Sequence, residues 1–167
     1  MPLTLNSDSP EGQSIRRWLA YLDEYDKGGR AQLRRASSVL DAIMCPAVHR
    51  LRHQLEELHP GAFSNQRADR LAMACALMAR LKQPVGRLAL PLAMSERVAG
   101  SDRNAVSELR FRRLLDAHND EALFTGLRRM LPLIDGLVCP VLLARDVVFW
   151  GDKVKRAWAY DYYRWPN

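Results

Sequence analysis

Apolar residues recur at helical spacing from the start of the chain. Residues 9–11, Ser-Pro-Glu, have the order of a helix N-cap, a first-position proline and a first-turn acid. The apolar residues that follow stand at positions i, i+3, i+4 and i+7: Ile15, Trp18, Leu19 and Leu22. The pattern predicts a helix of about 15 residues that ends at the glycine-containing segment 26–29.

Further helices are predicted over residues 30–43, 46–58 and 67–83, each with an apolar stripe. The pattern then weakens over residues 85–103, where glycine and proline interrupt a run of leucine and alanine. Beyond it, helices are predicted over residues 107–115, 120–130, 140–150 and 152–163.

Short links between these helices predict an all-α fold, a helical bundle of two packed halves with about four helices each. We place the halves at residues 1–95 and 96–167, and one continuous domain is the alternative. The composition agrees, because leucine and alanine total 45 residues against 15 for valine, isoleucine and threonine. Straight-chain and small side chains lose the least entropy on entering a helix.

Signals for secretion, membranes and catalysis are weak. The three cysteines, Cys45, Cys75 and Cys139, are odd in number and far apart, which favours a reducing compartment. There is no secretory pattern at the start and no stretch of ~20 apolar residues, so we expect a cytoplasmic protein without a membrane partner. His49, His53 and Glu57 share a helix face, but Arg50 stands where a metalloprotease has its glutamate. We therefore expect no enzyme, metal or cofactor.

The chain is basic, with a formal net charge of +6, and 21 of its 25 basic residues are arginine. Net charge informs about partners rather than fold, and the forked guanidinium suits phosphate recognition. An arginine preference also accompanies GC-rich coding and thermal adaptation. Composition alone therefore leaves nucleic-acid binding open.

The first basic cluster lies between Asp26 and Asp41, a segment without an acid. Its cations are Lys27, Arg30, Arg34 and Arg35. Arg30 and Arg34 share a helix face at i, i+4, where like charges repel unless an anion is bound. A solvated basic face and a phosphate contact both explain the pattern.

The second cluster surrounds an apolar stripe of Phe111, Leu114 and Leu115, so its arginines are predicted to point outward. They are Arg110, Arg112 and Arg113. Glu108 and Asp116 are near enough to neutralise part of this charge, so surface ion pairing weighs about as much as phosphate binding.

The last predicted helix interleaves cations with aromatic residues. Lys153, Arg156, Tyr160 and Tyr163 follow one side of it. Such a surface can hold a backbone and stack exposed bases. The alternative is that the aromatic residues anchor the core, which we favour for Trp158 and Trp165 and leave open for Tyr160.

Several segments taken in order carry a family resemblance. They are Trp18-Leu19, Gly29-Arg30-Ala31-x-Leu33-Arg34-Arg35, Arg110-Phe111-x-x-Leu114-Leu115, Asp146-x-x-x-Trp150, and Lys155-Arg156-x-Trp158-Ala159-x-x-Tyr162-Tyr163. Their order and spacing resemble the CasB-type small subunit of type I-E CRISPR surveillance complexes, the assembly called Cascade. The resemblance runs from about residue 15 to residue 163 and rests on the order of the segments.

The resemblance implies an all-helical, non-catalytic subunit that pairs with a second copy in a crRNA-guided complex. Its partners would be the other Cascade subunits, the crRNA, the target DNA and the displaced strand, while a recruited helicase-nuclease cleaves the DNA. The matching basic positions are Arg30, Arg34, Arg35, Arg110, Lys155 and Arg156. Neighbouring candidates are Arg112, Arg113, Arg129 and Lys153.

We expect these clusters to form one track that contacts phosphates without reading bases. Two other classes stay open. Residues 26–29 with their flanking helices resemble a helix-turn-helix, which predicts a symmetric dimer on a specific operator. A helical adaptor for an acidic protein predicts no retention of nucleic acid at physiological salt.

Overall fold

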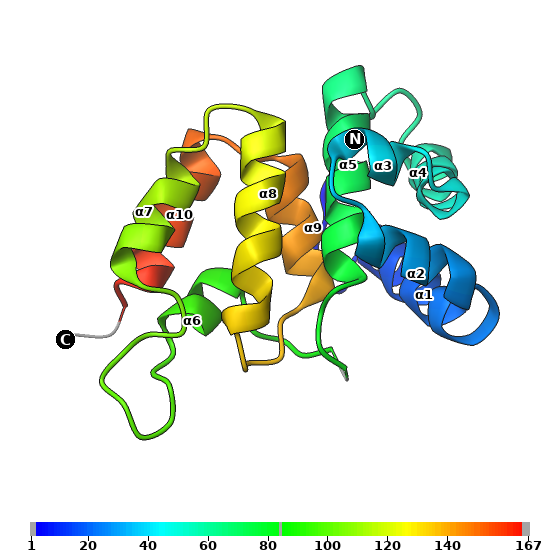
Figure 1. Ribbon diagram of the computed structural model, residues 1–167. Coiled ribbons are helices and arrows are strands. Elements are labelled where there is room, and N and C mark those ends of the chain that lie inside the picture. Colours follow the sequence, from blue (N-terminus) through cyan, green and yellow to red (C-terminus); the bar gives the residue numbers. More distant parts are fainter. Residues whose placement is uncertain (1–2, 84, 165–167) are drawn as a thin grey trace. The chain divides into compact units, whose positions relative to one another are not determined.

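The computed structural model describes residues 3–83 and 85–164, and over these residues it is built of α-helices and one 3₁₀ turn, without a strand (Figure 1). The elements are α1 (Pro10–Tyr25), α2 (Lys27–Arg35), α3 (Val39–Ile43), α4 (Pro46–Leu58), α5 (Asn65–Met78), α6 (Leu90–Ser95), α7 (Glu108–Leu115), α8 (Asp120–Met130), η1 (Leu131–Leu133), α9 (Pro140–Val148) and α10 (Asp152–Tyr162). The predicted all-α class is confirmed.

Short polar side chains set where several of these helices begin. The Ser9 hydroxyl accepts a hydrogen bond from the Gly12 amide at 3.1 Å, and the Ser107 hydroxyl accepts one from the Arg110 amide at 3.3 Å. Each satisfies a first-turn N–H that has no partner within the helix. The starts predicted after Ser9 and Ser107 are confirmed.

The helix predicted over residues 30–43 is two helices in the structure. The Asp26 carboxylate accepts a hydrogen bond from the Gly29 amide at 2.9 Å, so α2 begins directly after α1 and contains both glycines. The Ser38 hydroxyl accepts from the Asp41 amide at 3.1 Å and starts α3. Local side-chain caps therefore outweigh the continuous apolar periodicity.

Two other boundaries also differ from the predictions. The helix α5 starts behind the Ser64 cap and ends at Met78, so it is shifted and shorter than the predicted 67–83. The weak segment 85–103 contains a helix, α6, with Pro91 in its first turn. Proline is tolerated there because the first-turn amides have no intrahelical partner.

The chain forms two compact units. The first unit comprises Met1–Arg80 and Pro140–Phe149, and the second comprises Leu81–Cys139 and Trp150–Asn167. These bounds differ from a division at residue 95. Residues 86–88 join the second unit because they are hydrogen-bonded to residues 137–139, with Cys139 N donating to Leu88 O at 2.9 Å. The helix α9 joins the first unit because it packs on α5.

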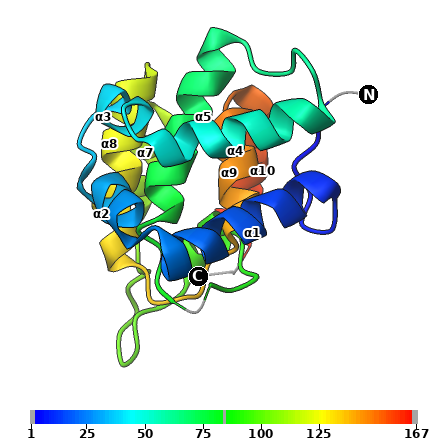
Figure 2. The ribbon, with the colours of Figure 1, turned by 90° about the vertical axis from the view of Figure 1, so that its right-hand side faces the viewer.

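The core of the first unit is α5, whose residues 71–78 are all fully buried. This helix packs against α9, α3, α2 and α4, while α1 lies beside α4 (Figure 2). A helix that is apolar on every side is stable only when other elements surround it.

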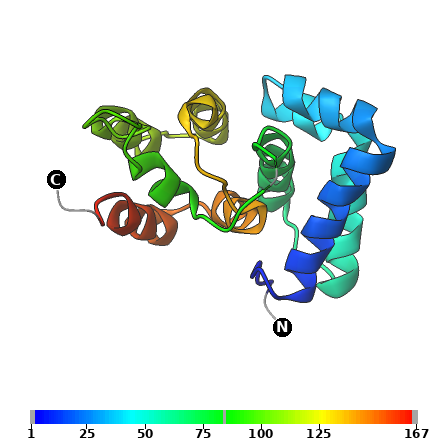
Figure 3. The same ribbon diagram turned by 90° about the horizontal axis from the view of Figure 1, so that it is seen from below.

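The second unit is held by aromatic contacts, with α6 lying beside α10 (Figure 3). Phe111 stacks on Tyr162 with ring centroids 4.1 Å apart, and Trp150 meets Trp158 edge to face at 4.9 Å. Trp158 is buried, which confirms its predicted role as a core anchor. Trp165 lies outside the described residues. In the part of the chain that the structure describes, the membrane search finds no helix with the length and apolar character of a membrane span.

Candidate nucleic-acid interface

The arginines of α7 are oriented by the residues between them. Phe111 and Leu114 are buried, so the side chains at the neighbouring positions of this helix face solvent. Arg110, Arg112 and Arg113 are all exposed, as predicted from the apolar stripe. The Ser107 cap sets the start of the helix and with it the register of the three arginines.

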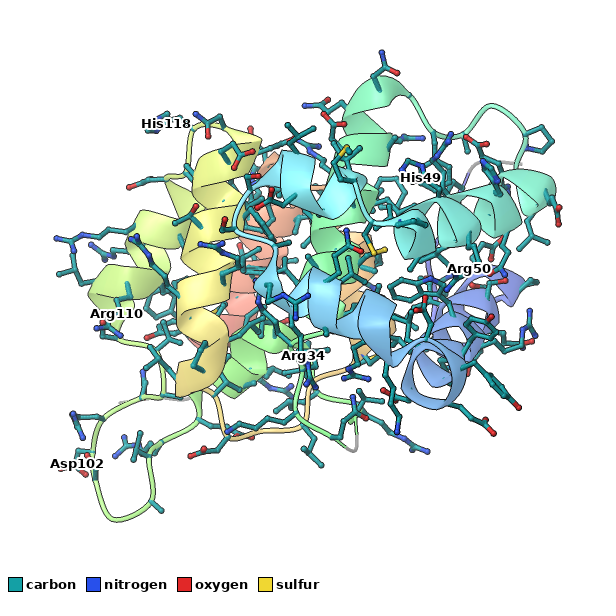
Figure 4. The ribbon with its side chains drawn as sticks, turned by 45° about the vertical axis from the view of Figure 1, so that its right-hand side comes forward. Arg34, His49, Arg50, Asp102, Arg110 and His118 are labelled. Atoms are coloured by element: carbon teal, nitrogen blue, oxygen red, sulfur yellow. The ribbon has the colours of Figure 1, made fainter. Side chains whose placement is uncertain are left out.

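Two of these arginines meet a third from the next helix. Arg110 and Arg113 of α7 and Arg129 of α8 line one groove of about 490 Å³, whose other lining residues include Leu114, Met130, Leu133, Gly126 and His118. Figure 4 shows Arg110 on α7 and His118 in the link that follows it. At Gly126 a Cβ atom would lie 2.8 Å from Leu114 Cδ1, so α8 lies close against α7 at this position. The groove thus has an apolar floor and a cationic rim.

The cations of this α7–α8 groove are available to a ligand. Among the described residues, Arg110, Arg113 and Arg129 form no ion pair, and the groove's lining contains a single carboxylate, that of Asp116. Three guanidinium groups beside a single carboxylate leave an excess of positive charge, and an anion in the groove reduces their mutual repulsion.

Arg112 has a different environment. Its guanidinium pairs with the Glu108 carboxylate at 2.8 Å, one helical turn away. A hydrogen bond with the Tyr163 hydroxyl, and then the charge of Glu108, raise the pKa of Arg112. Arg112 therefore forms the surface ion pair that was the alternative to phosphate binding for this cluster.

A second hollow adjoins the groove at Arg110. It has a volume of about 1010 Å³, and its lining includes Arg97 and Arg103 from the segment between α6 and α7. Sequence reasoning missed these two arginines because they lie in the segment where the helical pattern fails. The available signal was basic residues beside a turn glycine, a combination too common to single out a site.

In the α2 cluster, Arg30 is turned inward. Its residue is 6% exposed, and its guanidinium forms an ion pair with Asp23 of α1. Burial, followed by the positive charge of Arg34, lowers the pKa of Arg30 below its ordinary value. The guanidinium nitrogens Nε and Nη2 are buried without a hydrogen-bond partner among the described residues. Arg30 therefore does not present its charge to a surface ligand.

Arg34 is exposed, but its side chain also forms a hydrogen bond within the protein (Figure 4). Its Nε donates to the Ala79 carbonyl at 2.8 Å, and Arg80 donates back to the Arg34 and Ala36 carbonyls, both at 2.6 Å. These bonds tie the end of α2 to the end of α5. Lys27 and Arg35 are exposed and form no ion pair among the described residues.

On α10 the cations and the aromatic residues differ in exposure. Lys153 and Arg156 are exposed and Lys155 is half-buried. Tyr160 is 81% exposed, whereas the Tyr163 hydroxyl donates to Glu108 at 2.9 Å. Of the residues in the predicted stacking row, Tyr160 alone has a largely free ring.

The histidine and cysteine positions have structural surroundings. A ring nitrogen of His49, Nε2, lies 2.7 Å from the Ile43 carbonyl, and the described residues contain no group of three potential metal ligands. All three cysteines are buried, and none is in a disulfide among the described residues. Burial raises the pKa of the Cys75 thiol well above its ordinary value, so this sulfur is a core atom.

The helix-turn-helix alternative requires an exposed recognition helix behind a short turn. In the structure, Asp26 alone separates α1 from α2, and Arg30 and Leu33 of α2 are buried. That motif joins its helices through a turn of about three or four residues. The geometry of α1 and α2 does not match it.

The comparisons with known proteins assign a family. The model of the family "CRISPR-associated protein Cse2" matches residues 29–163. CasB from Thermus thermophilus is similar in structure, with a TM-score of 0.66 and 22% identity over 94% of this chain and 99% of that one. A second crystal structure from Thermus thermophilus, of a CRISPR-associated protein of the Cse2 family, gives a TM-score of 0.69 at the same identity and coverage.

A chain in the crystal structure of E. coli Cascade bound to a PAM-containing double-stranded DNA target is also similar. Its TM-score is 0.60 and its identity 25%, over 90% of this chain and 91% of that one. The search of the curated proteins gives no match. An all-helical chain matched by this family model over most of its length is a CRISPR-associated protein. It belongs to the Cse2 family, which confirms the resemblance predicted from the sequence.

Proposed function

We propose that the chain is a non-catalytic subunit of a crRNA-guided surveillance complex of the Cascade type and supports nucleic acid through its sugar-phosphate backbone. Membership of the Cse2 family supports a place in the CRISPR system. The similarity to a chain of E. coli Cascade, a complex crystallised with target DNA, supports a place in an assembly that holds DNA.

The observation that carries the binding role is the α7–α8 groove, where Arg110, Arg113 and Arg129 converge without ion pairs among the described residues. Guanidinium groups form charge-assisted, often bidentate hydrogen bonds with phosphate oxygens. Contacts of this kind set the position of a strand and carry no sequence information. The ligand of the groove is therefore a phosphodiester chain, with base reading left to the guide RNA.

Modest contacts are sufficient for this role. Opening a DNA duplex against a guide RNA exchanges one duplex for another of similar stability, so the net free energy of the exchange is close to zero. Phosphate contacts worth a few kcal/mol therefore decide whether the open state persists. We infer that the subunit stabilises the target DNA and the displaced strand, and that it acts as a pair in the cytoplasm beside the other Cascade subunits.

The test uses the assembled complex with one arginine reversed. Arg110→Glu is expected to shorten the lifetime of target-bound Cascade about tenfold, because a lost charge-assisted hydrogen bond costs about 1.5 kcal/mol. Arg87→Glu is the matched control, since Arg87 is exposed in the same unit but does not line the groove. An unchanged lifetime with Arg110→Glu would contradict the proposal. Loss of a protein contact without any effect on DNA would favour the adaptor class instead.

A further inference from the structure

The segment between α6 and α7 is a hairpin with a defined backbone. Ala105 N donates to Glu96 O and Val98 N donates to Arg103 O, both at 2.8 Å. Gly100 takes a φ of +74° in the turn, a conformation that other residues adopt at a cost. The hairpin, residues 96–106, therefore positions its side chains through its own hydrogen bonds, and Asp102 lies near its tip (Figure 4).

This hairpin brings two arginines next to the α7–α8 groove. Arg97 and Arg103 line the hollow of about 1010 Å³, and Arg110 lines both this hollow and the groove. Arg110 is thus shared by two adjoining cationic surfaces of the second unit. A strand whose phosphate is bound by Arg110 has further phosphates within reach of both.

The carboxylates of the hollow are Asp102 and Glu108. Glu108 is engaged by Arg112 at 2.8 Å and by the Tyr163 hydroxyl at 2.9 Å, both outside the hollow's lining. Asp102 pairs with Arg97 at 3.3 Å, and both side chains are at least half exposed. An exposed pair of this kind is weak, so a stronger or better-placed anion opens it readily.

We propose that the hairpin hollow is a second phosphodiester site, in which Arg97 and Arg103 bind the backbone that continues from the groove. In the free protein the Asp102 carboxylate occupies the place of a phosphate on Arg97, and the bound strand displaces it. The inference rests on the proposed function and extends it to residues outside the helical clusters. It makes Asp102 an internal competitor whose removal strengthens binding.

Binding of a single-stranded oligothymidylate to the full chain, measured against salt, tests the site. In the Arg97→Ala/Arg103→Ala variant the slope of log K against log salt is expected to fall in magnitude by about 1.4, since each phosphate on a single strand contributes about 0.7. Asp102→Asn is expected to bind about two- to fivefold more tightly, the range that an exposed ion pair spans. The opposite signs of these changes separate phosphate competition from a general disturbance of the hairpin.

Arg87→Ala is the matched control, and its slope and affinity are expected to equal those of the wild type. Oligouridylate is run beside oligothymidylate, and both polymers should lose the same slope because the ligand is the phosphodiester. An unchanged slope in Arg97→Ala/Arg103→Ala, with a reduced slope in Arg110→Ala/Arg113→Ala, would overturn the hairpin site alone. No binding by the wild-type chain at low salt would overturn the proposed function as well. Weaker binding by Asp102→Asn would contradict the competition.

Discussion

The basic clusters on α2 and α7 have similar sequences, but their arginines have different environments in the structure. Each is a short helix that carries two adjacent arginines next to a buried leucine. In the α2 cluster, Arg30 is buried against Asp23 of the preceding helix and Arg34 donates to the Ala79 carbonyl. In the α7 cluster, Arg112 pairs with the Glu108 carboxylate, whereas Arg110 and Arg113 line an open groove.

The difference shows that arginine density does not by itself distinguish a binding surface from a structural bond. What decides is whether another part of the fold supplies an acceptor. For Arg30 and Arg34 the acceptors come from α1 and from the end of α5. For Arg113 and Arg129 no ion pair exists within the described residues, so both groups are open to solvent and to an external anion.

The largest expected effect is on the groove. Arg110→Ala/Arg113→Ala/Arg129→Ala should lower the affinity of the full chain for a single-stranded oligonucleotide about 100-fold at low salt, since three contacts each contribute about 1 kcal/mol or more. Fluorescence anisotropy measures the affinity, and thermal unfolding checks that the second unit is intact. An affinity within about threefold of the wild type, a difference close to the error of such measurements, would contradict a binding role for the groove.

The next effect is on stability in the first unit. Arg30→Ala should lower the free energy of unfolding by about 2 kcal/mol, because the packed side-chain stem and the Asp23 pair are both lost. Arg30→Met keeps the volume and should stay within about 1 kcal/mol of the wild type. Urea unfolding measures both variants, and oligonucleotide affinity should change in neither. Reduced affinity with unchanged stability in Arg30→Ala would reverse the assignment.

A smaller effect is expected from Asp26, whose pKa is lowered mainly by the hydrogen bond from Arg50 and also by the Gly29 amide. A carboxylate with a depressed pKa stabilises the fold above its ordinary value of 3.8 and loses that contribution as the pH falls through the folded value. Asp26→Asn should cost about 0.5–1 kcal/mol at neutral pH, as for a partly exposed pair. The free energies of unfolding of the two proteins should be measured from about pH 7 to about pH 2.5, the range over which such carboxylates titrate. The two values should converge at the acid end. A constant difference across that range would exclude the Asp26 charge as the cause.

The smallest effect is expected at Arg35, which is exposed and forms no ion pair among the described residues. Arg35→Ala should change the free energy of unfolding by less than about 0.5 kcal/mol, as surface substitutions usually do. Its oligonucleotide affinity should also stay close to that of the wild type. A clear loss of affinity in Arg35→Ala, with the stability unchanged, would make the α2 cluster a binding surface.

Local rules predicted the parts of the fold that depend on neighbouring residues. The caps at Ser9 and Ser107, the helix opened by Pro46 and the outward direction of the α7 arginines all follow from spacing and first-turn chemistry. The same rules missed α6, because Gly86 and Pro91 break the periodicity from which a helix is inferred. They also joined α2 and α3 into one helix, because Ser38 is a cap only when the backbone turns there.

Tertiary partners were beyond these rules. Nothing in the order of residues indicates that Asp23 pairs with Arg30 or that the Ala79 carbonyl accepts from Arg34. The meeting of Arg129 with Arg110 and Arg113 depends on the close packing of α8 on α7 at Gly126. The family resemblance pointed to Arg110 as a candidate. The groove that Arg110 lines is formed only when α7 and α8 pack together.

The salt dependence of oligonucleotide binding by two matched double variants tests the central claim most directly. Arg110→Ala/Arg113→Ala and Arg34→Ala/Arg35→Ala remove the same charge from the same chain. The first should reduce the magnitude of the slope of log K against log salt by about 1.4, the contribution of two phosphates on a single strand. The second should leave the slope unchanged and lower only the unfolding temperature. Equal slope losses in the two variants, or a loss confined to the second, would contradict the account.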